Sequence, residues 1–243
     1  MSSRVVGFDR ELKKSWLDLT ARLVAAGITD KELKTELDSS LEGELSDNGC
    51  VRGAKGKTIT VLMKLWGKVP ANAQALRDEA IKIMALSPAD SLLLHWGLAM
   101  AVYPYFYDAV ENVGRLASLQ GSFSVSQLQR RMREKYGERE TVSRAVNRLV
   151  QSLLEWGVIE ELPEKRTFKT VQAVTVLDAN ITAWVLEASL VASGNKSGPV
   201  DGLIKSQALF PFKFNMLNTT IFSQHPRLQL FRQGVDEDVV MFK

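Results

Sequence analysis

The stretch that decides the expected fold is residues 124–170, SVSQLQRRMREKYGERETVSRAVNRLVQSLLEWGVIEELPEKRTFKT. A first helix should begin after Ser124, a favourable N-cap, and end at Gly137, because apolar residues recur between them at helical spacing. A second helix is expected over residues 138–156, where another apolar stripe runs up to a glycine at position 157. The members of this second stripe are Val142, Val146, Leu149, Leu153 and Trp156, and the opposite, solvent-facing side of the helix is expected to carry Arg144, Asn147, Arg148 and Gln151.

The residues after the second helix have the composition of a β-hairpin. Residues 158–162 and 167–176 are rich in β-branched side chains, and a polar turn with Pro163, Lys165 and Arg166 separates them. Helix, turn, helix and hairpin therefore follow one another along the chain. The second half of the hairpin is expected to continue as far as Val176.

This order of elements resembles a winged helix-turn-helix. The resemblance lies within residues 119–177 and is carried by QLQRRMREKYG, by ETVSRAVNRLVQSLLEWGVIEEL and, for the wing, by PEKRTFKT. It implies that the second helix is a recognition helix. The chain also has a weaker similarity, without a diagnostic motif, to the BrxA-type small proteins of bacterial phage-exclusion (BREX) systems. That similarity implies a subunit of a DNA-directed defence complex.

The remaining sequence predicts a mainly α protein, a helical bundle with a central winged helix-turn-helix and a short β-hairpin wing. Residues 1–104 are expected to form an N-terminal helical domain, residues 105–177 the winged helix-turn-helix, and residues 178–243 a C-terminal helix with a Phe-rich tail. This tail should pack against the body of the protein. Its short β-like runs either pair with the wing or serve an oligomer.

The most apolar stretch of the chain, residues 90–110, is expected to be a buried core helix. The apolar segment before its proline, Pro104, spans only 13 residues (91–103), whereas a helix needs about 20 to cross a bilayer. The protein is therefore not expected to enter a membrane. The first residues lack the apolar core and small-residue cleavage site of a secretion signal, which favours a cytoplasmic location.

The composition argues against a disulfide, a metal site and catalysis, but it does not identify a class of binding partner. The 31 Lys and Arg nearly balance the 28 Asp and Glu, so the net charge of +3 selects no class of partner. A single cysteine, Cys50, and two histidines, His95 and His225, leave neither a disulfide nor a metal cluster, and no cofactor is expected. His95 lies in the apolar helix and is interpreted as a core residue. Because the sequence offers no clear pair of a nucleophile and a general base, the chain is not expected to be an enzyme.

Residues 49–58, GCVRGAKGKT, end like a nucleotide-binding P-loop but fail its spacing. The motif requires a glycine five positions before Gly56, and that position holds Val51. The preceding sequence also has the period of a helix and not the composition of a strand. We expect a Gly-rich loop that leads into a helix running to Trp66. Lys55 and Lys57 would then be either solvated or placed to hold a DNA phosphate at the start of that helix.

Local charge indicates nucleic acid as the ligand. Residues 130–148 contain seven Lys or Arg and three Glu, a balance of +4 that exceeds that of the whole chain. We expect double-stranded DNA binding by a regulator or by a non-catalytic subunit of a larger complex. The alternative is a winged helix that binds protein partners of a complex, or a second copy of itself, without touching DNA. The candidate DNA-binding residues are Arg130, Arg131, Arg133, Arg139, Thr141, Arg144, Asn147, Arg148, Gln151, Lys165, Arg166, Lys169, Lys55 and Lys57.

Overall fold

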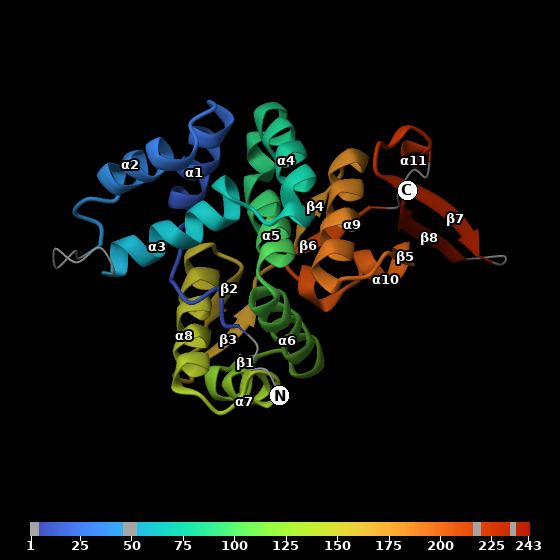
Figure 1. Cartoon of the computed structure of the whole chain (residues 1–243). Helices are drawn as coiled ribbons and strands as arrows, with labels where there is room; N and C mark the ends of the chain where they lie inside the picture. Colours follow the sequence, from blue (N-terminus) through green and yellow to red (C-terminus); the bar gives the residue numbers. More distant parts are fainter. Residues whose placement is uncertain (1–4, 46–52, 216–219, 234–236) are drawn as a thin grey trace.

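The structure is a computed structural model that describes residues 5–45, 53–215, 220–233 and 237–243 (Figure 1). The protein is mainly helical with three small sheets among these residues, which confirms the mainly α class. Up to Gln120, all elements that the structure describes are helices. The α-helices are α1 (Lys14–Ala25), α2 (Asp30–Ser40), α3 (Ala54–Leu62, continued by a π-helical segment Met63–Gly67), α4 (Gln74–Leu86), α5 (Ser91–Val102) and α6 (Pro104–Gln120).

The central part alternates short strands with two helices, and the last part adds further strands around one long helix. The central elements are β1 (Phe123–Ser124), α7 (Val125–Tyr136), α8 (Glu140–Glu155), β2 (Ile159–Glu161) and β3 (Thr167–Thr170). The C-terminal elements are β4 (Val174–Val176), α9 (Ala179–Ser193), β5 (Ser197–Pro199), α10 (Val200–Ile204), β6 (Phe212–Phe214), α11 (Ile221–Gln224), β7 (Leu228–Gln233) and β8 (Glu237–Phe242).

Helix α5 lies at the centre of the protein, as its apolar sequence predicts. Every one of its residues except Leu92 is buried, and it packs against α4, α6 and α9 (Figure 1). The approach to α9 is close because position 97 is a glycine. A Cβ placed on Gly97 would lie 2.4 Å from the ring of Trp184, so any larger side chain would push the two helices apart.

One hydrophobic core draws on all three segments expected from the sequence. It extends from Phe8 to Phe212. At its centre, Trp96 of α5 makes edge-to-face contacts with Trp156 at the end of α8 and with Phe210 and Phe212 of the tail. The N-terminal, central and C-terminal parts are therefore packed into a shared interior, in which aromatic pairs add to the gain from burial.

The hairpin is shorter than the sequence predicts. Strands β2 and β3 pair in antiparallel register, Ile159 with Thr170, and β1 pairs along the other edge of β3. The expectation that this ribbon continues to Val176 is wrong. Its partner strand begins directly after α8, and the last backbone bond joins Val171 N–H to the Val158 carbonyl. Beyond that point no partner remains, and β4 pairs in parallel with β6 instead.

The Phe-rich tail packs on α9 and β4. Strands β5, β8 and β7 form an antiparallel sheet next to α9 (Figure 1). A second buried cluster joins Leu186 and Leu190 of α9 to Phe222, Leu228 and Val240. Of the two roles expected for the β-like runs, pairing with the wing does not occur among the described residues.

Candidate nucleic-acid interface

Both ends of helix α7 are set by residues that the sequence identifies, an N-cap serine and a terminal glycine. Ser124 and Gln127 form a capping box, in which Ser124 Oγ accepts from the Gln127 N–H and Gln127 Oε1 accepts from the Ser124 N–H at 2.8 Å. Gly137 ends the helix with a φ of +92°, which side chains with a Cβ rarely adopt. The short connection that follows turns the chain directly into α8.

Helix α8 is held by the apolar stripe that the sequence predicts. Val142, Val146, Leu149, Leu153 and Trp156 are all buried. The opposite side of the helix carries a row of exposed polar side chains at helical spacing. This row, which we call the α8 row, consists of Thr141, Arg144, Arg148 and Gln151.

Asn147 does not lie in the α8 row. It was expected on the solvent face, but it is half-buried, and its Oδ1 accepts hydrogen bonds from Arg166 Nη2 at 2.6 Å and from Gln129 Nε2 at 3.2 Å. Bidentate contact with adenine needs both the oxygen and the amide nitrogen of an asparagine. Because two donors already occupy this oxygen, Asn147 acts here as a junction between α7, α8 and the hairpin.

Arg133 supports the same junction from α7. Its Nε donates to Ser143 Oγ on α8 at 2.8 Å, and the Gln129 amide donates to the Ser143 carbonyl at 3.2 Å. Glu138 lies 3.7 Å from the Arg133 guanidinium. Two side chains of α7 thus set the position of α8 through its first two turns.

The tip of the hairpin is held in an uncommon backbone conformation. Arg166 has a φ of +59°, a left-handed conformation that costs a non-glycine residue about 1 kcal/mol or more. Its N–H donates to Glu161 Oε1 at 3.1 Å, and its guanidinium is bound to Asn147. The neighbouring Lys165 is exposed. The sequence therefore places Arg166 correctly at the tip but gives no sign of its bond to α8.

Carboxylates accompany several of the candidate cations. Arg144 pairs with Glu140 at 3.2 Å, Arg148 with Glu11 at 3.6 Å and Lys169 with Glu160 at 2.7 Å. These pairs are exposed, and exposed pairs contribute about 0–1 kcal/mol. A phosphate group could therefore replace the carboxylate in each of them at small cost.

The remaining cations of the central segment lie on other sides of the two helices. Arg130 is exposed on α7. Arg131 lies one turn before Lys135, whose ammonium binds Asp108 of α6 at 2.6 Å, so Arg131 faces the α6 side and not the α8 row. Arg139 precedes α8, is half-buried and donates to the Tyr136 carbonyl at 3.0 Å.

The two lysines of the Gly-Lys-Thr stretch differ in their surroundings. They lie in the first turn of α3, but Gly49, Cys50 and Val51 fall outside the described residues. Lys55 is only 5% exposed, and its ammonium donates to Asp38 Oδ2 at 3.1 Å and to the Asp38 carbonyl at 3.3 Å. Lys57 is exposed. Lys55 is thus neither solvated nor open to a phosphate, and only Lys57 of this pair points to solvent.

No pattern in the sequence indicates that the N-terminal segment lies along α8. The Leu12 N–H donates to Ser152 Oγ at 2.9 Å, and the Lys14 N–H donates to Glu155 Oε2 at 2.7 Å. These bonds bring Glu11 beside Arg148. The contacting residues are about 140 positions apart, and no local pattern reports a contact across such a distance.

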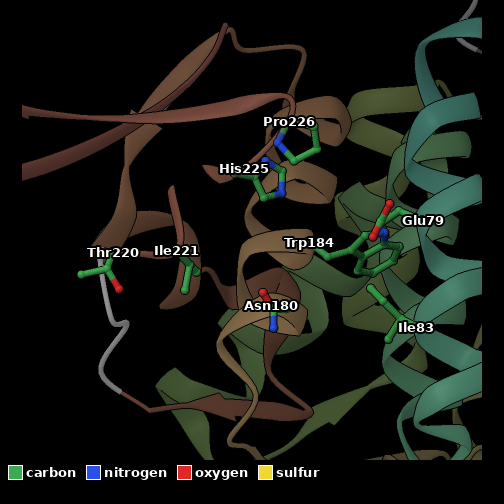
Figure 2. A pocket seen from close by; sticks show the side chains of 8 residues that line it. All are labelled: Glu79, Ile83, Asn180, Trp184, Thr220, Ile221, His225 and Pro226. Atoms are coloured by element: carbon green, nitrogen blue, oxygen red, sulfur yellow. The ribbon is translucent and has the colours of Figure 1, made fainter. Parts of the chain in front are cut away.

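A separate pocket of about 550 Å³ lies between α4, α9 and the C-terminal segment (Figure 2). Figure 2 shows Glu79 and Ile83 on the α4 side, His225 and Pro226 on the C-terminal segment, and Trp184 between them. The backbone N–H of Leu228 donates to His225 Nδ1 at 3.0 Å, which leaves Nε2 as the protonated nitrogen. Burial lowers the pKa of His225, so this imidazole is neutral near pH 7.

Within the described ranges, no group of three or more His, Cys, Asp or Glu side chains is arranged to hold a metal ion. No helix of this part of the chain combines the length and the apolar character needed to cross a membrane.

When the chain was compared with protein-family models, curated proteins and solved structures, none of the three comparisons gave a match.

Proposed function

We propose that residues 104–170 form a winged helix-turn-helix that binds double-stranded DNA, with α8 as the recognition helix and the β2–β3 hairpin as the wing. The observation that carries this proposal is the α8 row, a line of four exposed donors next to a hairpin tip that carries Lys165 and Arg166. Such a helix presents Arg and Gln to base edges in the major groove, while the hairpin reaches the phosphates beside it.

The pattern of fixed and exposed groups supports this assignment. Asn147, Arg133 and Arg166 hold α7, α8 and the hairpin in one arrangement, so the α8 row is presented by a rigid support. Rigid presentation lowers the entropy lost on binding. Arg144 and Arg148 are paired with carboxylates, and replacing these carboxylates by DNA phosphates should cost little free energy because the pairs are exposed.

In this proposal the protein is a cytoplasmic regulator, or a non-catalytic subunit of a bacterial DNA-directed complex such as an anti-phage defence system. The second candidate is a winged helix that binds a protein without touching DNA. The observation in its favour is that acidic side chains already accompany Arg144, Arg148 and Lys169. A surface with interleaved charges suits a protein partner as well as it suits a phosphate backbone.

Salt dependence separates the two functions. The pure protein is titrated against a fluorescent random-sequence duplex of about 30 base pairs by anisotropy, at salt concentrations from about 50 to 300 mM. DNA binding predicts a straight log–log decrease of affinity, with a slope of about −0.9 for each phosphate contacted. Absence of binding at about 100 μM protein in the lowest salt would exclude even the usual nonspecific affinity and would favour the protein-binding alternative.

A further inference from the structure

A hollow of about 410 Å³ lies between α1 and the turn that joins α4 to α5. Helix α1 contributes Lys14, Asp18 and Arg22 to its lining, spaced four residues apart on one face of the helix. The opposite wall contains Met84, Pro88 and Ser91. This volume is within the usual range for small-molecule sites.

Asp18 is locked into the wall of this hollow by a buried chain of hydrogen bonds. Trp66 Nε1 donates to His95 Nδ1 at 3.1 Å, so the imidazole carries its hydrogen on Nε2, which donates to Asp18 Oδ1 at 2.9 Å. His95 is completely buried, and this burial lowers its pKa despite the opposing effect of Asp18. His95 is therefore neutral near pH 7 and serves to orient the carboxylate.

The charge of Asp18 is already balanced. Its second oxygen accepts from Lys14 Nζ at 2.7 Å. Burial alone would raise the pKa of Asp18, but the hydrogen bonds from His95 and Lys14 outweigh it and lower this pKa well below the ordinary value. A ligand entering the hollow thus meets an ion pair with no net charge, not a free carboxylate.

Two groups of the lining remain without partners in the part of the chain that the structure describes. Arg22 lies one turn beyond Asp18 and has neither an ion pair nor a side-chain hydrogen bond there, which gives the hollow a charge of about +1. Ser91 is only 5% exposed, and its hydroxyl has no hydrogen-bond partner among those residues. The hydroxyl oxygen does not belong to the fully buried side-chain atoms that lack a partner, and the hollow that Ser91 lines is the space from which a ligand reaches it.

We propose that this hollow binds a small organic anion of the phosphate monoester class, independently of the DNA-binding function. Arg22 and the Ser91 hydroxyl donate to the oxyanion, an arrangement in which a guanidinium gives its strongest hydrogen bonds. Ser91 is also in the first turn of α5, where the helix dipole favours negative charge. The organic part of the ligand lies on Met84 and Pro88.

Isothermal titration calorimetry with phenyl phosphate as the probe tests the proposal. Inorganic phosphate represents the oxyanion alone, benzoate represents a carboxylate of similar size, and phenol represents the apolar part without charge. The wild-type protein should bind phenyl phosphate more tightly than inorganic phosphate or benzoate, and phenol should give no saturable heat.

Two variants of the lining and one matched control complete the test. Arg22→Gln removes a charged donor and should weaken binding of phenyl phosphate about tenfold or more. Ser91→Ala removes the hydroxyl and should weaken it severalfold, since one neutral donor is lost. Lys34→Gln removes one exposed charge on α2 and should have no effect. All three changes spare the apolar core, and unchanged thermal unfolding verifies that the variants are folded.

Two results would overturn the proposal. The first is the absence of saturable heat with phenyl phosphate at about 10 mM, a concentration at which even millimolar binding is visible. The second is an equal loss of affinity in Arg22→Gln and Lys34→Gln. This result would mean that the affinity for the anion depends on the total charge of the protein and not on the hollow.

Discussion

The indole N–H of Trp156 donates a hydrogen bond of 2.8 Å to the carbonyl of Leu12, a residue 144 positions earlier in the chain. Trp156 ends the apolar stripe of α8, and its ring also contacts Phe8 and Phe106 in the core. The N-terminal segment is therefore attached to the end of the proposed recognition helix. This contact and the hydrogen bonds from α7 both hold α8 in place.

Replacing Trp156 should destabilise the whole protein. Trp156 is only 5% exposed, so Trp156→Ala leaves a large cavity and should lower the free energy of unfolding by about 3–5 kcal/mol. Trp156→Phe keeps most of the packing but loses the bond to Leu12, and a smaller loss is expected. Urea unfolding followed by circular dichroism measures both. A Trp156→Ala protein as stable as the wild type would show that this ring is not part of the core.

Local periodicity was sufficient to predict α7, α8 and the buried α5, because each pattern depends on residues within a few turns of one another. It could not predict where β3 ends. That limit is set by β2, which has no residues available to pair beyond Val158. The left-handed backbone of Arg166 was equally hidden, since its support comes from Asn147 on another element.

In the candidate site, too, local spacing predicted some positions correctly, whereas positions set by contacts between distant segments were not predicted. Arg144 and Arg148 were placed on the exposed side of α8 by helical spacing alone, and the structure agrees. Asn147 was misplaced because spacing cannot show that the hairpin folds back onto α8. Lys55 was misplaced because its partner, Asp38, comes from α2. In both cases the missing information is the packing of distant segments.

The α8 row should carry the DNA affinity. The double change Arg144→Gln and Arg148→Gln should weaken duplex binding and make the log–log salt slope less steep by up to about two units, if each arginine contacts one phosphate. Neither residue is in the apolar stripe, so the fold should be unaffected. Fluorescence anisotropy at several salt concentrations gives both quantities.

A charge change on the N-terminal segment provides an opposite control. Glu11→Gln removes the carboxylate that lies 3.6 Å from Arg148, and it should strengthen DNA binding because phosphate no longer competes with it. Lys34→Gln together with Lys205→Gln removes two exposed charges elsewhere and should have a smaller effect than the arginine pair. Equal effects of the two double changes would mean that α8 has no special part in binding.

Acid should destabilise the protein through His95. Burial lowers the pKa of this histidine below its ordinary value of 6.5, so the unfolded chain binds a proton that the folded protein does not. The stability that depends on neutral His95 is complete above about pH 6.5 and is lost as the pH falls towards the folded pKa. The free energy of unfolding should therefore fall with decreasing pH, by at most about 1.4 kcal/mol per pH unit for this residue.

The variant His95→Gln isolates this contribution. Glutamine can still accept from Trp66 and donate to Asp18 but does not titrate. The pKa of His225 is also lowered by burial, so part of the pH dependence should persist in His95→Gln and disappear only in the double variant with His225→Gln. Urea unfolding at pH 5.5, 6.5 and 7.5 tests this. An identical pH dependence in His95→Gln and the wild type would mean that the pKa of His95 is the same in the folded and the unfolded chain.

Lys55 and Lys57, two residues apart at the start of α3, should respond differently to substitution. The Lys55 ammonium is bound to Asp38 of α2, so Lys55→Ala should lower the free energy of unfolding by about 1–3 kcal/mol, as expected for loss of a hydrogen-bonded charge. Lys57 is exposed, and Lys57→Ala should change the free energy of unfolding by less than about 0.5 kcal/mol.

If this loop also touches DNA, Lys57 alone makes the contact. The salt slope of the double variant should then equal that of Lys57→Ala, about one unit less steep than the wild type. A slope that decreases by a further unit when Lys55 is also removed would show that the Lys55–Asp38 pair opens when DNA binds.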